Sequence, residues 1–447
     1  MVETRGQNAS AITVRFRGPT QRPPEFLVYR TDLRPNRIER RFAGKEGATA
    51  ATWDGMLADG RRAGAGTYLI AVKVRDGAGN IGTGPAILPP RPGGVDGHPG
   101  VTVRFVAAQP PLEPVLAGAQ TVFNVDARRL SYTWSIRRVG APGPRKSGTK
   151  TTPQVRVRVP RGASGLYLFE ARHGQNATRV PFAVQARSQR SVLVVLPAIT
   201  WQGRNPVDDD GDGLPNTLDN LVAARISRPF AGDGLPQGFA EREAPLLVFL
   251  DRTHHRYDIT TDLALLRGHG PKLEDHRGVL LAGDVRWLPA GLQARLRRFV
   301  EQGGRVASVG IDSLRRGVGN SPSGQRLFHP TAPAIRDVFS SRLRSLERKR
   351  VDLLALDPPP DALGLFATTD GSFPGFDAIE ETADLGSGTE TKLQAAAGPA
   401  QGRPVIVAYR LGKGLVIRFG LPQWTQRLAT DTNVSEVMQR TWTLISR

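Results

Sequence analysis

The feature that most constrains the fold is a change in hydrophobic rhythm near residue 188. Before it, segments such as Ile12–Phe16 and Val155–Val159 alternate apolar and polar residues, which is typical of strands with one buried face. After it, Val192–Leu196 is an unbroken apolar, β-branched run, which is typical of a strand buried on both faces. The chain is therefore expected to join all-β modules to a doubly wound α/β domain.

The length of the chain supports several domains. A sequence of 447 residues is too long for one ordinary hydrophobic core, so two or three domains are expected. The segment 84–98 is rich in Pro and Gly and has the composition of a linker. We expect a β-sandwich over residues 1–88, a second β-sandwich over residues 89–187, and the α/β domain over residues 188–447.

The expected elements of the α/β domain follow from periodicity and turn signals. Besides Val192–Leu196, buried strands are expected at 246–250, 278–284 and 305–310, and a hairpin at 405–409 and 415–419. Helices are expected over 218–226, after Pro289, and from Asn433 or Ser435. A charged helix is expected over 341–350, which 351–356 would either extend or follow as a strand.

The first β segment resembles the immunoglobulin-like module of the flagellar-hook capping protein family. The resemblance rests on the W-D-G turn at 53–55, the D-G turn at 59–60 and the G-T-Y strand start at 66–68. It implies a spacer or adhesion module rather than a catalyst.

The last part of the chain resembles the C-terminal domain of the N,N-dimethylformamidase large subunit, which has a class I glutamine-amidotransferase-like fold. The features are Thr200-Trp201-Gln202 after the first strand, Tyr257-Asp258 with Thr261-Asp262-Leu263, and Gly412-Lys413-Gly414 before Gly420-Leu421-Pro422. The resemblance spans about residues 188–447. It implies an amidotransferase-like sheet and raises two catalytic expectations, one for a nucleophile and one for a metal.

The nucleophile implied by the resemblance is missing. Amidotransferases of this fold carry a cysteine in the turn after the strand that here ends at Gly310, where this chain has Ile311-Asp312-Ser313. The sequence contains no cysteine at all, which excludes glutamine hydrolysis by that route. Ser313 would need an oriented base, and no spacing places His254 or His255 beside it, so we expect exposed loop residues.

A catalytic metal is not expected either. For formamidase-like activity a metal would have to activate water, and relatives show an acidic-Tyr-Trp run after the third strand. The matching stretch here is Asp284-Val285-Arg286-Trp287, in which a cation replaces the oxygen ligand. Asp312, Glu380 and Glu381 are further oxygen ligands, but no motif spacing joins them.

The strongest chemical motif is an acidic loop over residues 208–219. An EF-type calcium loop takes oxygen ligands from positions 1, 3, 5, 7, 9 and 12, with glycine at position 6. Here those positions are Asp208, Asp210, Asp212, the Leu214 carbonyl, Asn216 and Asp219, with Gly213 at position 6. The loop resembles those of dockerin and thrombospondin type 3 repeats. We expect a structural calcium ion, against the alternative of a solvated acidic turn.

A ligand pocket is expected where the parallel strands end. Ligands of open α/β sheets bind beyond the carboxyl ends of the strands. The residues expected to line such a pocket are Thr200, Trp201, Asn205, Asp284, Asp312 and Ser313. Trp201 would either stack on a flat ligand such as a sugar or belong to the core.

Charge and hydropathy bear on partners and location. The formal charge is +20, but the arginines are spread along the sequence with no basic tail, which argues against nucleic acid as the partner. No apolar run is long enough for a transmembrane helix, and no signal peptide begins the chain. The β modules and the calcium loop favour an extracellular or cell-envelope location.

Three functions remain open from the sequence. The first is a non-catalytic binding protein of the cell surface or exterior, with a carbohydrate or an envelope polymer as the expected ligand. The second is a hydrolase of amides or carbohydrates, which requires Asp284, Asp312, Glu380 and Glu381 to converge. The third is a nucleic-acid binder, which requires the arginines to gather on one face.

Overall fold

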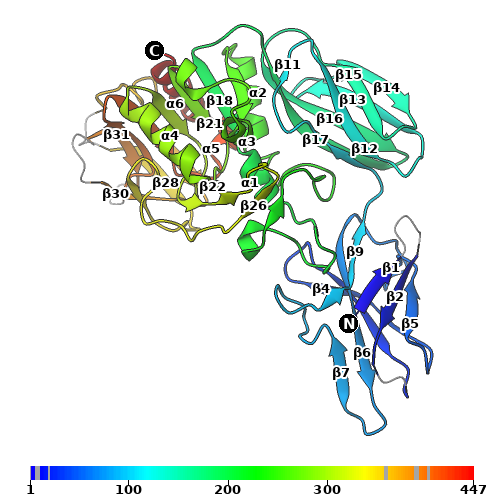
Figure 1. Ribbon diagram of the computed structural model, residues 1–447. Coiled ribbons are helices and arrows are strands. Elements are labelled where there is room, and N and C mark those ends of the chain that lie inside the picture. Colours follow the sequence, from blue (N-terminus) through cyan, green and yellow to red (C-terminus); the bar gives the residue numbers. More distant parts are fainter. Residues whose placement is uncertain (1, 6–10, 19–20, 357–360, 387–391, 400–402) are drawn as a thin grey trace.

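A computed structural model describes residues 2–5, 11–18, 21–356, 361–386, 392–399 and 403–447. Figure 1 shows three parts: an N-terminal β module in blue, a second β module in cyan, and a larger body that runs from green to red. The second module lies against the body, and the N-terminal module projects away from it. Within the described residues, none of the helices has the length and apolar character needed to cross a membrane.

The N-terminal module consists of two sheets that share one hydrophobic cluster. One sheet has the order β5 (Ala50–Trp53), β2 (Ile12–Phe16), β1 (Val2–Arg5), β8 (Gly97–His98). The other has β4 (Arg37–Ala43), β3 (Glu25–Arg30), β6 (Gly66–Arg75) and β7 (Ile81–Gly84), with β9 (Gly100–Val103) also paired to β6. Strand β9 lies within the range expected for the second module (residues 89–187), but it joins the first module, because its partner is β6. Phe16, Phe26, Trp53 and Tyr68 fill the space between the sheets.

The second module also has two sheets around an aromatic centre. The smaller sheet is β10 (Ala107–Gln109), β12 (Gln120–Asp126), β15 (Gln154–Arg158), and the larger is β11 (Val115–Leu116), β17 (Asn176–Gln185), β16 (Gly165–His173), β13 (Tyr132–Arg138), β14 (Lys146–Lys150). Phe123 of the first sheet stacks on Phe169 of the second with ring centroids 4.1 Å apart. Phe182 meets Phe123 edge-on at 4.9 Å, so the two sheets are joined by large apolar contacts.

The body is built on a nine-stranded sheet. Its order is β20 (Asp258–Thr261), β18 (Val192–Leu196), β21 (Gly278–Leu281), β23 (Arg305–Ser308), β33 (Gly414–Phe419), β32 (Ile406–Leu411), β31 (Leu393–Gly398), β28 (Val351–Ala355), β29 (Ser372–Phe376). The first five strands are parallel, and the last four continue the sheet antiparallel. The expected hairpin is formed by β32 and β33 around Gly412.

Both faces of the parallel half are covered, as the uninterrupted apolar run of β18 predicts. Val192, Val194 and Leu196 face a cluster that contains residues of α2 (Glu243–Arg252) and α6 (Thr432–Ser446). Leu193 and Val195 face a second cluster, which contains residues of α3 (Asp262–Arg267) and α4 (Ala290–Glu301). Successive side chains of a strand point to opposite faces, so a strand between two helical layers must be apolar throughout.

The expectation of a strand at 246–250 is wrong, because these residues form the middle of helix α2. Leu246, Leu247 and Leu250 face the sheet, while Val248 faces the second β module, where it packs on Gly140. A helix enclosed between two layers is apolar all round, and a short apolar run of that kind cannot be distinguished from a buried strand by periodicity. The second parallel strand is instead β20, which follows α2.

Two other expected helices are absent from the described residues. The segment 218–226 holds only a 3₁₀ turn, Leu218–Asn220, and the two-residue strand β19, Ala224–Arg225. Leu221 takes a left-handed conformation with φ 61° and is exposed, so the chain turns where a helix would continue. The segment 341–350 begins with strand β27 (Ser341–Leu343), which pairs with β30 (Thr382–Leu385), and Val351–Ala355 forms strand β28.

The remaining helix expectations are confirmed. Helix α4 follows Pro289 and buries Leu292, Leu296, Phe299 and Val300, as their spacing predicts. Helix α6 buries Val437, Met438 and Trp442. Its N-cap is Asp431 rather than Asn433 or Ser435, because the Asp431 carboxylate accepts a hydrogen bond from the Val434 amide. Short elements complete the body: α1 (Ala198–Gly203), α5 (Trp424–Arg427), a 3₁₀ turn at Leu273–Asp275, β22 (Trp287–Leu288), β24 (Arg316–Gly317), β25 (Gly319–Asn320) and β26 (Arg326–Phe328).

Candidate functional site

The topology of the parallel strands marks one edge of the sheet as a binding position. Counted along the chain, the parallel strands have the order 2-1-3-4-5, so connections leave β18 and β21 in opposite directions. In doubly wound sheets the crevice at such a switch point, beyond the carboxyl ends of the strands, is where ligands bind. Helix α1 with Thr200 and Trp201 follows β18, and Asp284 follows β21.

Asp284 joins the loops that follow two neighbouring strands. It is buried, and its Oδ1 accepts a hydrogen bond from the Ile311 amide at 3.1 Å, in the turn after β23. Its Oδ2 lies 3.5 Å from Arg242 Nε and 3.9 Å from Arg204 Nη1. This carboxylate therefore holds the strand-end loops together and is balanced by two guanidinium groups.

Asp312 is surrounded by arginines. Its backbone has φ 45°, an uncommon conformation for a residue with a side chain. Its carboxylate pairs with Arg286, with Arg316 at 3.1 Å and with Arg315 at 3.3 Å. A carboxylate held by three guanidinium groups is a poor metal ligand, since its lone pairs already accept charged hydrogen bonds.

Glu380 is the third carboxylate at this edge. It reaches the site from the loop before β30, pairs with Arg418 of β33, and accepts the Asp312 amide at 3.0 Å. Burial raises the pKa of Glu380, and the Arg418 and Arg315 charges act in the opposite direction. Glu381 does not join this group, because its carboxylate lies 3.7 Å from Arg403 and 3.9 Å from Arg344 elsewhere.

Glu243 is a buried carboxyl group at the same edge that the sequence did not reveal. It begins helix α2, is 1% exposed, and its Oε2 has no hydrogen-bond partner among the described residues. Burial raises the pKa of Glu243 to about 8, with the Asp284 charge acting in the same direction. It lies against Gly283, where any side chain would collide with it. An acidic residue in the first turn of a helix could have pointed to Glu243, but the segment that follows was expected to be a strand.

The polar residues expected to line a pocket mostly have structural partners. Thr200 Oγ1 accepts the Arg286 amide at 2.9 Å, and Ser313 Oγ donates to the Ile311 carbonyl and accepts the Val285 amide. Asn205 bonds Gln202, Pro229 and Ala231, which fixes the chain after α1. Trp201 is buried and packs edge-on against Phe239 at 5.9 Å. His254 and His255 lie on the loop before β20, at the opposite end of the strands from Ser313.

The strand-end residues do not fit a catalytic metal. Arg286 occupies the expected ligand position, and its guanidinium pairs with Asp312 and, at 2.7 Å, with Asp219. A divalent cation there would replace a fixed positive charge that already neutralises both carboxylates. Within the described part of the chain, the one group of three or more acidic or histidine residues close enough to share a cation is Asp208, Asp210 and Asp212.

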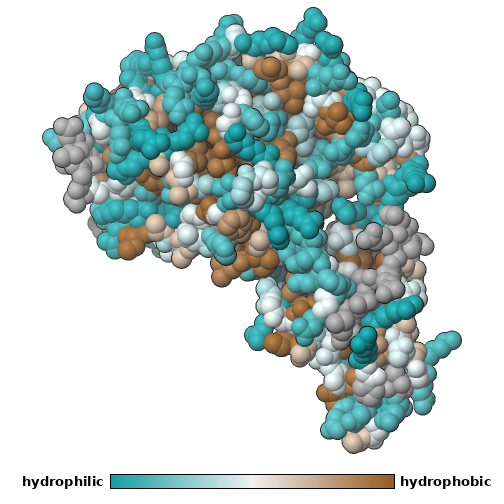
Figure 2. Space-filling model, in the orientation of Figure 1, coloured by the Kyte–Doolittle hydropathy of each residue, from teal (hydrophilic) through white to brown (hydrophobic). Residues whose placement is uncertain are grey.

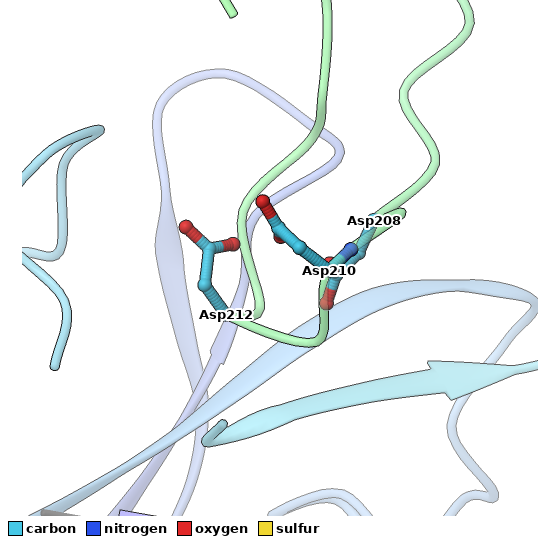
Figure 3. Close-up of side chains that lie close together, drawn as sticks. All are labelled: Asp208, Asp210 and Asp212. Atoms are coloured by element: carbon cyan, nitrogen blue, oxygen red, sulfur yellow. The ribbon is translucent and has the colours of Figure 1, made fainter. Parts of the chain in front are cut away.

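Those three carboxylates lie together in the acidic loop. Their ligand oxygens are all within 4.8 Å of one another, and Figure 3 shows the side chains gathered around one turn of the loop. Asn216 joins them by donating to Asp210 at 3.1 Å. Asp219 does not, because its carboxylate pairs with Arg204 at 3.3 Å and with Arg286. The structure thus brings together Asp208, Asp210, Asp212 and Asn216, which are positions 1, 3, 5 and 9 of the expected calcium loop. Asp219, at position 12, points to other partners.

The electrostatics of this cluster favour a cation. Burial raises the pKa of Asp208 to about 6, with the Asp212 charge acting in the same direction. Burial also raises the pKa of Asp212 to about 6, with the Asp210 charge adding to the effect. Carboxylates that repel one another in a partly buried place are stabilised by a shared cation, and oxygen ligands suit calcium.

The acidic loop also attaches the N-terminal module to the body. The Gly100 amide donates to the Gly211 carbonyl at 2.8 Å, and Thr31 Oγ1 donates to the Gly213 carbonyl at 2.6 Å. Leu214 is buried in a cluster with Leu27, Tyr29 and Leu69 of that module. Figures 1 and 3 show the green loop lying on the blue strands. The cluster of carboxylates therefore sits at the junction between two parts of the molecule.

Comparison with known proteins supports part of the resemblance seen in the sequence. Residues 142–342 match the family model of the N,N-dimethylformamidase beta subunit-like C-terminal domain. The match begins inside the second β module and ends at β27, so it covers the switch point, the acidic loop and the turn that holds Asp312.

The other comparisons are distant. The A-type ATP synthase subunits A of Pyrobaculum neutrophilum and Pyrobaculum arsenaticum are 26% and 27% identical to 49% of this chain. The chain spans 33% of the length of these curated relatives. Among solved structures, a cold-adapted β-galactosidase from Rahnella sp. R3 has a TM-score of 0.34 at 14% identity over 58% of this chain and 32% of its own. An exo-β-1,4-mannosidase from an Opitutaceae bacterium has a TM-score of 0.32 at 12% identity, over 58% of this chain and 36% of its own.

Proposed function

We propose that this chain is a non-catalytic, multi-domain binding protein of the cell surface or exterior. In this proposal two immunoglobulin-like sandwiches precede a degenerate amidotransferase-like domain, and the acidic loop holds a structural calcium ion. The expected ligand is a carbohydrate or an envelope polymer. The observation that carries the proposal is that Asp284, Asp312 and Glu380 at the strand ends are each bound by arginines.

The lack of a nucleophile supports a binding role. The sequence has no cysteine, and the hydroxyl of Ser313 is engaged by two backbone groups with no histidine beside it. A serine nucleophile needs a base within hydrogen-bond reach and an oxyanion site opposite the reacting carbonyl. The strand-end edge is instead a closed network of ion pairs, which is suited to fixing loops.

A structural calcium ion is supported by the position of the acidic loop. The ion would join Asp208, Asp210 and Asp212. The Asp210 carbonyl lies 2.9 Å from His98 Nδ1 of the N-terminal module, and the carbonyls of Gly211 and Gly213 accept hydrogen bonds from that module. Binding to the folded state alone would raise the stability of the junction according to the calcium concentration. Such a site suits a calcium-rich exterior.

The test is calorimetric titration of calcium into the chelator-treated full chain. We expect heat of binding and a higher melting temperature for the wild type, and neither for Asp210→Ala/Asp212→Ala. Glu46→Ala/Asp275→Ala is the matched control, because both side chains are exposed and form no ion pair or hydrogen bond in the described structure. Equal responses from the wild type and the acidic-loop variant would contradict the calcium site.

A hydrolase acting on amides or carbohydrates is the second candidate. It is favoured by the convergence of Asp284, Asp312 and Glu380 and by the buried Glu243 beside them, whose Oε2 has no hydrogen-bond partner among the described residues and whose pKa burial raises to about 8. A carboxyl group with a raised pKa beside a second carboxyl group is the arrangement of a general acid and its partner. Hydrolysis of simple amides or aryl glycosides by the wild type, lost in Glu243→Gln, would replace the binding proposal with this one.

A further inference from the structure

A cavity lined by arginines lies at the seam between the second β module and the body. Its volume is about 640 Å³. The walls come from the loop after β15, the connection from β17 to β18, and the loop before β20, so the cavity opens at the amino ends of the parallel strands. In Figure 1 this seam lies between the cyan module and helix α2. It is therefore separate from the strand-end site.

The charge of this cavity is its distinguishing feature. Six of the fifteen lining residues are arginine and none is Asp or Glu: Arg138, Arg158, Arg161, Arg187, Arg190 and Arg256. Arginine makes up roughly one residue in eight of the sequence, so about two would be expected among fifteen by composition. The +20 net charge is thus locally concentrated, although the sequence shows only a diffuse distribution.

Most of these guanidinium groups lack a protein acceptor. Arg138 is bound by Asp251, through Nε at 2.6 Å and Nη2 at 2.7 Å. Arg158 has a long contact of 3.4 Å to the Gly118 carbonyl. Arg161, Arg187, Arg190 and Arg256 make no side-chain ion pair or hydrogen bond with any residue that the structure describes.

The cavity continues into a second one of about 580 Å³, and together they form the seam groove. The second cavity shares Arg138, His255 and Arg256 with the first and adds Arg252. Its only acidic residue is Asp251, whose oxygens are already taken by Arg138 and by the Tyr257 hydroxyl at 2.8 Å. No carboxylate in the groove is thus available to neutralise the remaining arginines.

The shape of the groove favours a small ligand over nucleic acid. Single-stranded nucleic acid needs exposed aromatic faces for base stacking. The aromatic groups here are occupied, because the His255 ring stacks on Trp442 at 4.6 Å and Tyr257 is buried. A concave cavity of several hundred Å³ has the size of a small-molecule site.

We propose that the seam groove binds a small ligand that carries two or more phosphate or sulfate groups. Guanidinium groups match the oxygens of such groups with paired, charge-assisted hydrogen bonds. Four unpaired guanidinium groups around one cavity call for a multiply charged partner, because a single negative charge would leave them repelling one another. Since the groove joins the second module to the body, the ligand would also hold these two parts together.

The experiment titrates inorganic pyrophosphate, orthophosphate and sulfate into the full chain by calorimetry at low and moderate salt. The groove variant is Arg187→Gln/Arg256→Gln. The control variant is Arg22→Gln/Arg91→Gln, which removes the same charge from exposed arginines of the N-terminal module. Neither pair forms a side-chain ion pair or hydrogen bond with the described residues, so all variants are expected to fold, and circular dichroism checks this.

The wild type and the control variant should bind pyrophosphate more tightly than either smaller anion, and the groove variant should lose at least about tenfold in affinity. Equal affinities of all three proteins would overturn the proposal, since binding would then reflect net charge alone. Groove-dependent binding of single-stranded DNA or RNA, without pyrophosphate binding, would overturn it in favour of a nucleic-acid site.

Discussion

Among single residues, Glu243 is a buried carboxyl group at the strand-end edge that lacks an ion-pair partner among the described residues. Its carboxyl is fully buried, one oxygen has no partner, and its pKa is raised to about 8 by burial. In the unfolded chain the same group has its ordinary pKa near 4.5. The folded state therefore keeps a proton that the unfolded state releases, over the range from about pH 4.5 to 8.

The consequence is a measurable pH dependence of stability. The free energy of unfolding should fall as the pH rises from about 4.5 to 8, because deprotonation favours the unfolded chain. Glu243→Gln removes this contribution and should be more stable than the wild type at pH 9 by a few kcal/mol, on the order set by a shift of several pKa units. Denaturant melts at pH 5 and pH 9 measure it.

Glu241→Gln is the matched control, since Glu241 is exposed and only two residues away. It should retain the pH dependence of the wild type. A Glu243→Gln variant with the same difference between pH 5 and pH 9 as the wild type would show that this carboxyl is ionised in the folded protein.

The sequence predicted individual site residues only where the site is local. Asp208, Asp210 and Asp212 are two residues apart, so their spacing alone brings their carboxylates together. The contact between Glu380 and the Asp312 amide joins residues 68 apart and depends on the order of strands in the sheet. The role of Asp219 was missed for the same reason, because its partner Arg286 comes from another strand-end loop.

Among the elements, helix α2 shows how a neighbouring module decides what a sequence can form. Its outer residue Val248 packs on Gly140 of the second β module. A Cβ added at Gly140 would lie 2.6 Å from Val248 Cγ2, and Gly140 has φ +79°. This glycine is required both for its backbone conformation and for the close approach of the helix.

Substitution at this contact should separate the two requirements. Gly140→Ala should lower the free energy of unfolding by about 2–4 kcal/mol, from backbone strain and overpacking together. Gly174→Ala, at φ +56° with open space around it, should show only the strain of about 1 kcal/mol. Combining Gly140→Ala with Val248→Ala should recover part of the loss.

Chemical denaturation of the three variants and of Val248→Ala alone gives the coupling energy. Independent, additive effects of the two substitutions would mean that the helix does not press against the module at this point.

Elements were predicted well where one hydrophobic pattern fits only one kind of element, and poorly where it fits both a helix and a strand or where distant partners decide. The run Val192–Leu196 and the spacing of Leu292, Leu296 and Phe299 each match one period, and both elements form as expected. Helix α2 has an apolar residue on each side because two layers enclose it, and neither layer is visible in its own sequence. The segments at 218–226 and 341–350 are determined by turns and distant partners.

At the scale of the whole molecule, the main question is how firmly the N-terminal module is held. Figure 2 shows a mostly hydrophilic visible surface on the body, with apolar residues in small groups. The module meets the body through the acidic loop, where Leu214 enters a cluster of the module. Inter-domain contacts of limited area leave relative motion as the default, so this one side chain has a large share in the docking.

Leu214→Ala should therefore loosen the module without unfolding it. Loss of a buried leucine costs about 2–5 kcal/mol, which is enough to populate undocked conformations. Small-angle X-ray scattering should show a larger radius of gyration, and limited proteolysis should release the module sooner. Leu33→Ala is the control, because Leu33 is exposed on the same module. An unchanged radius of gyration would mean that contacts other than Leu214 hold the module against the body.

The acidic loop gives the N-terminal module a second point of attachment, since the chain itself already connects β9 to β10. A module attached only through its linker can rotate freely about it, whereas a module attached through both the linker and the acidic loop transmits a rotation to the rest of the molecule. Asp209, in the same loop, pairs with Arg228 at 2.8 Å. Arg228 in turn donates hydrogen bonds to the carbonyls of Gln202 and Asn205. A force applied to the N-terminal module by a bound ligand would therefore be transmitted through Asp209 and Arg228 to helix α1, at the switch point of the sheet.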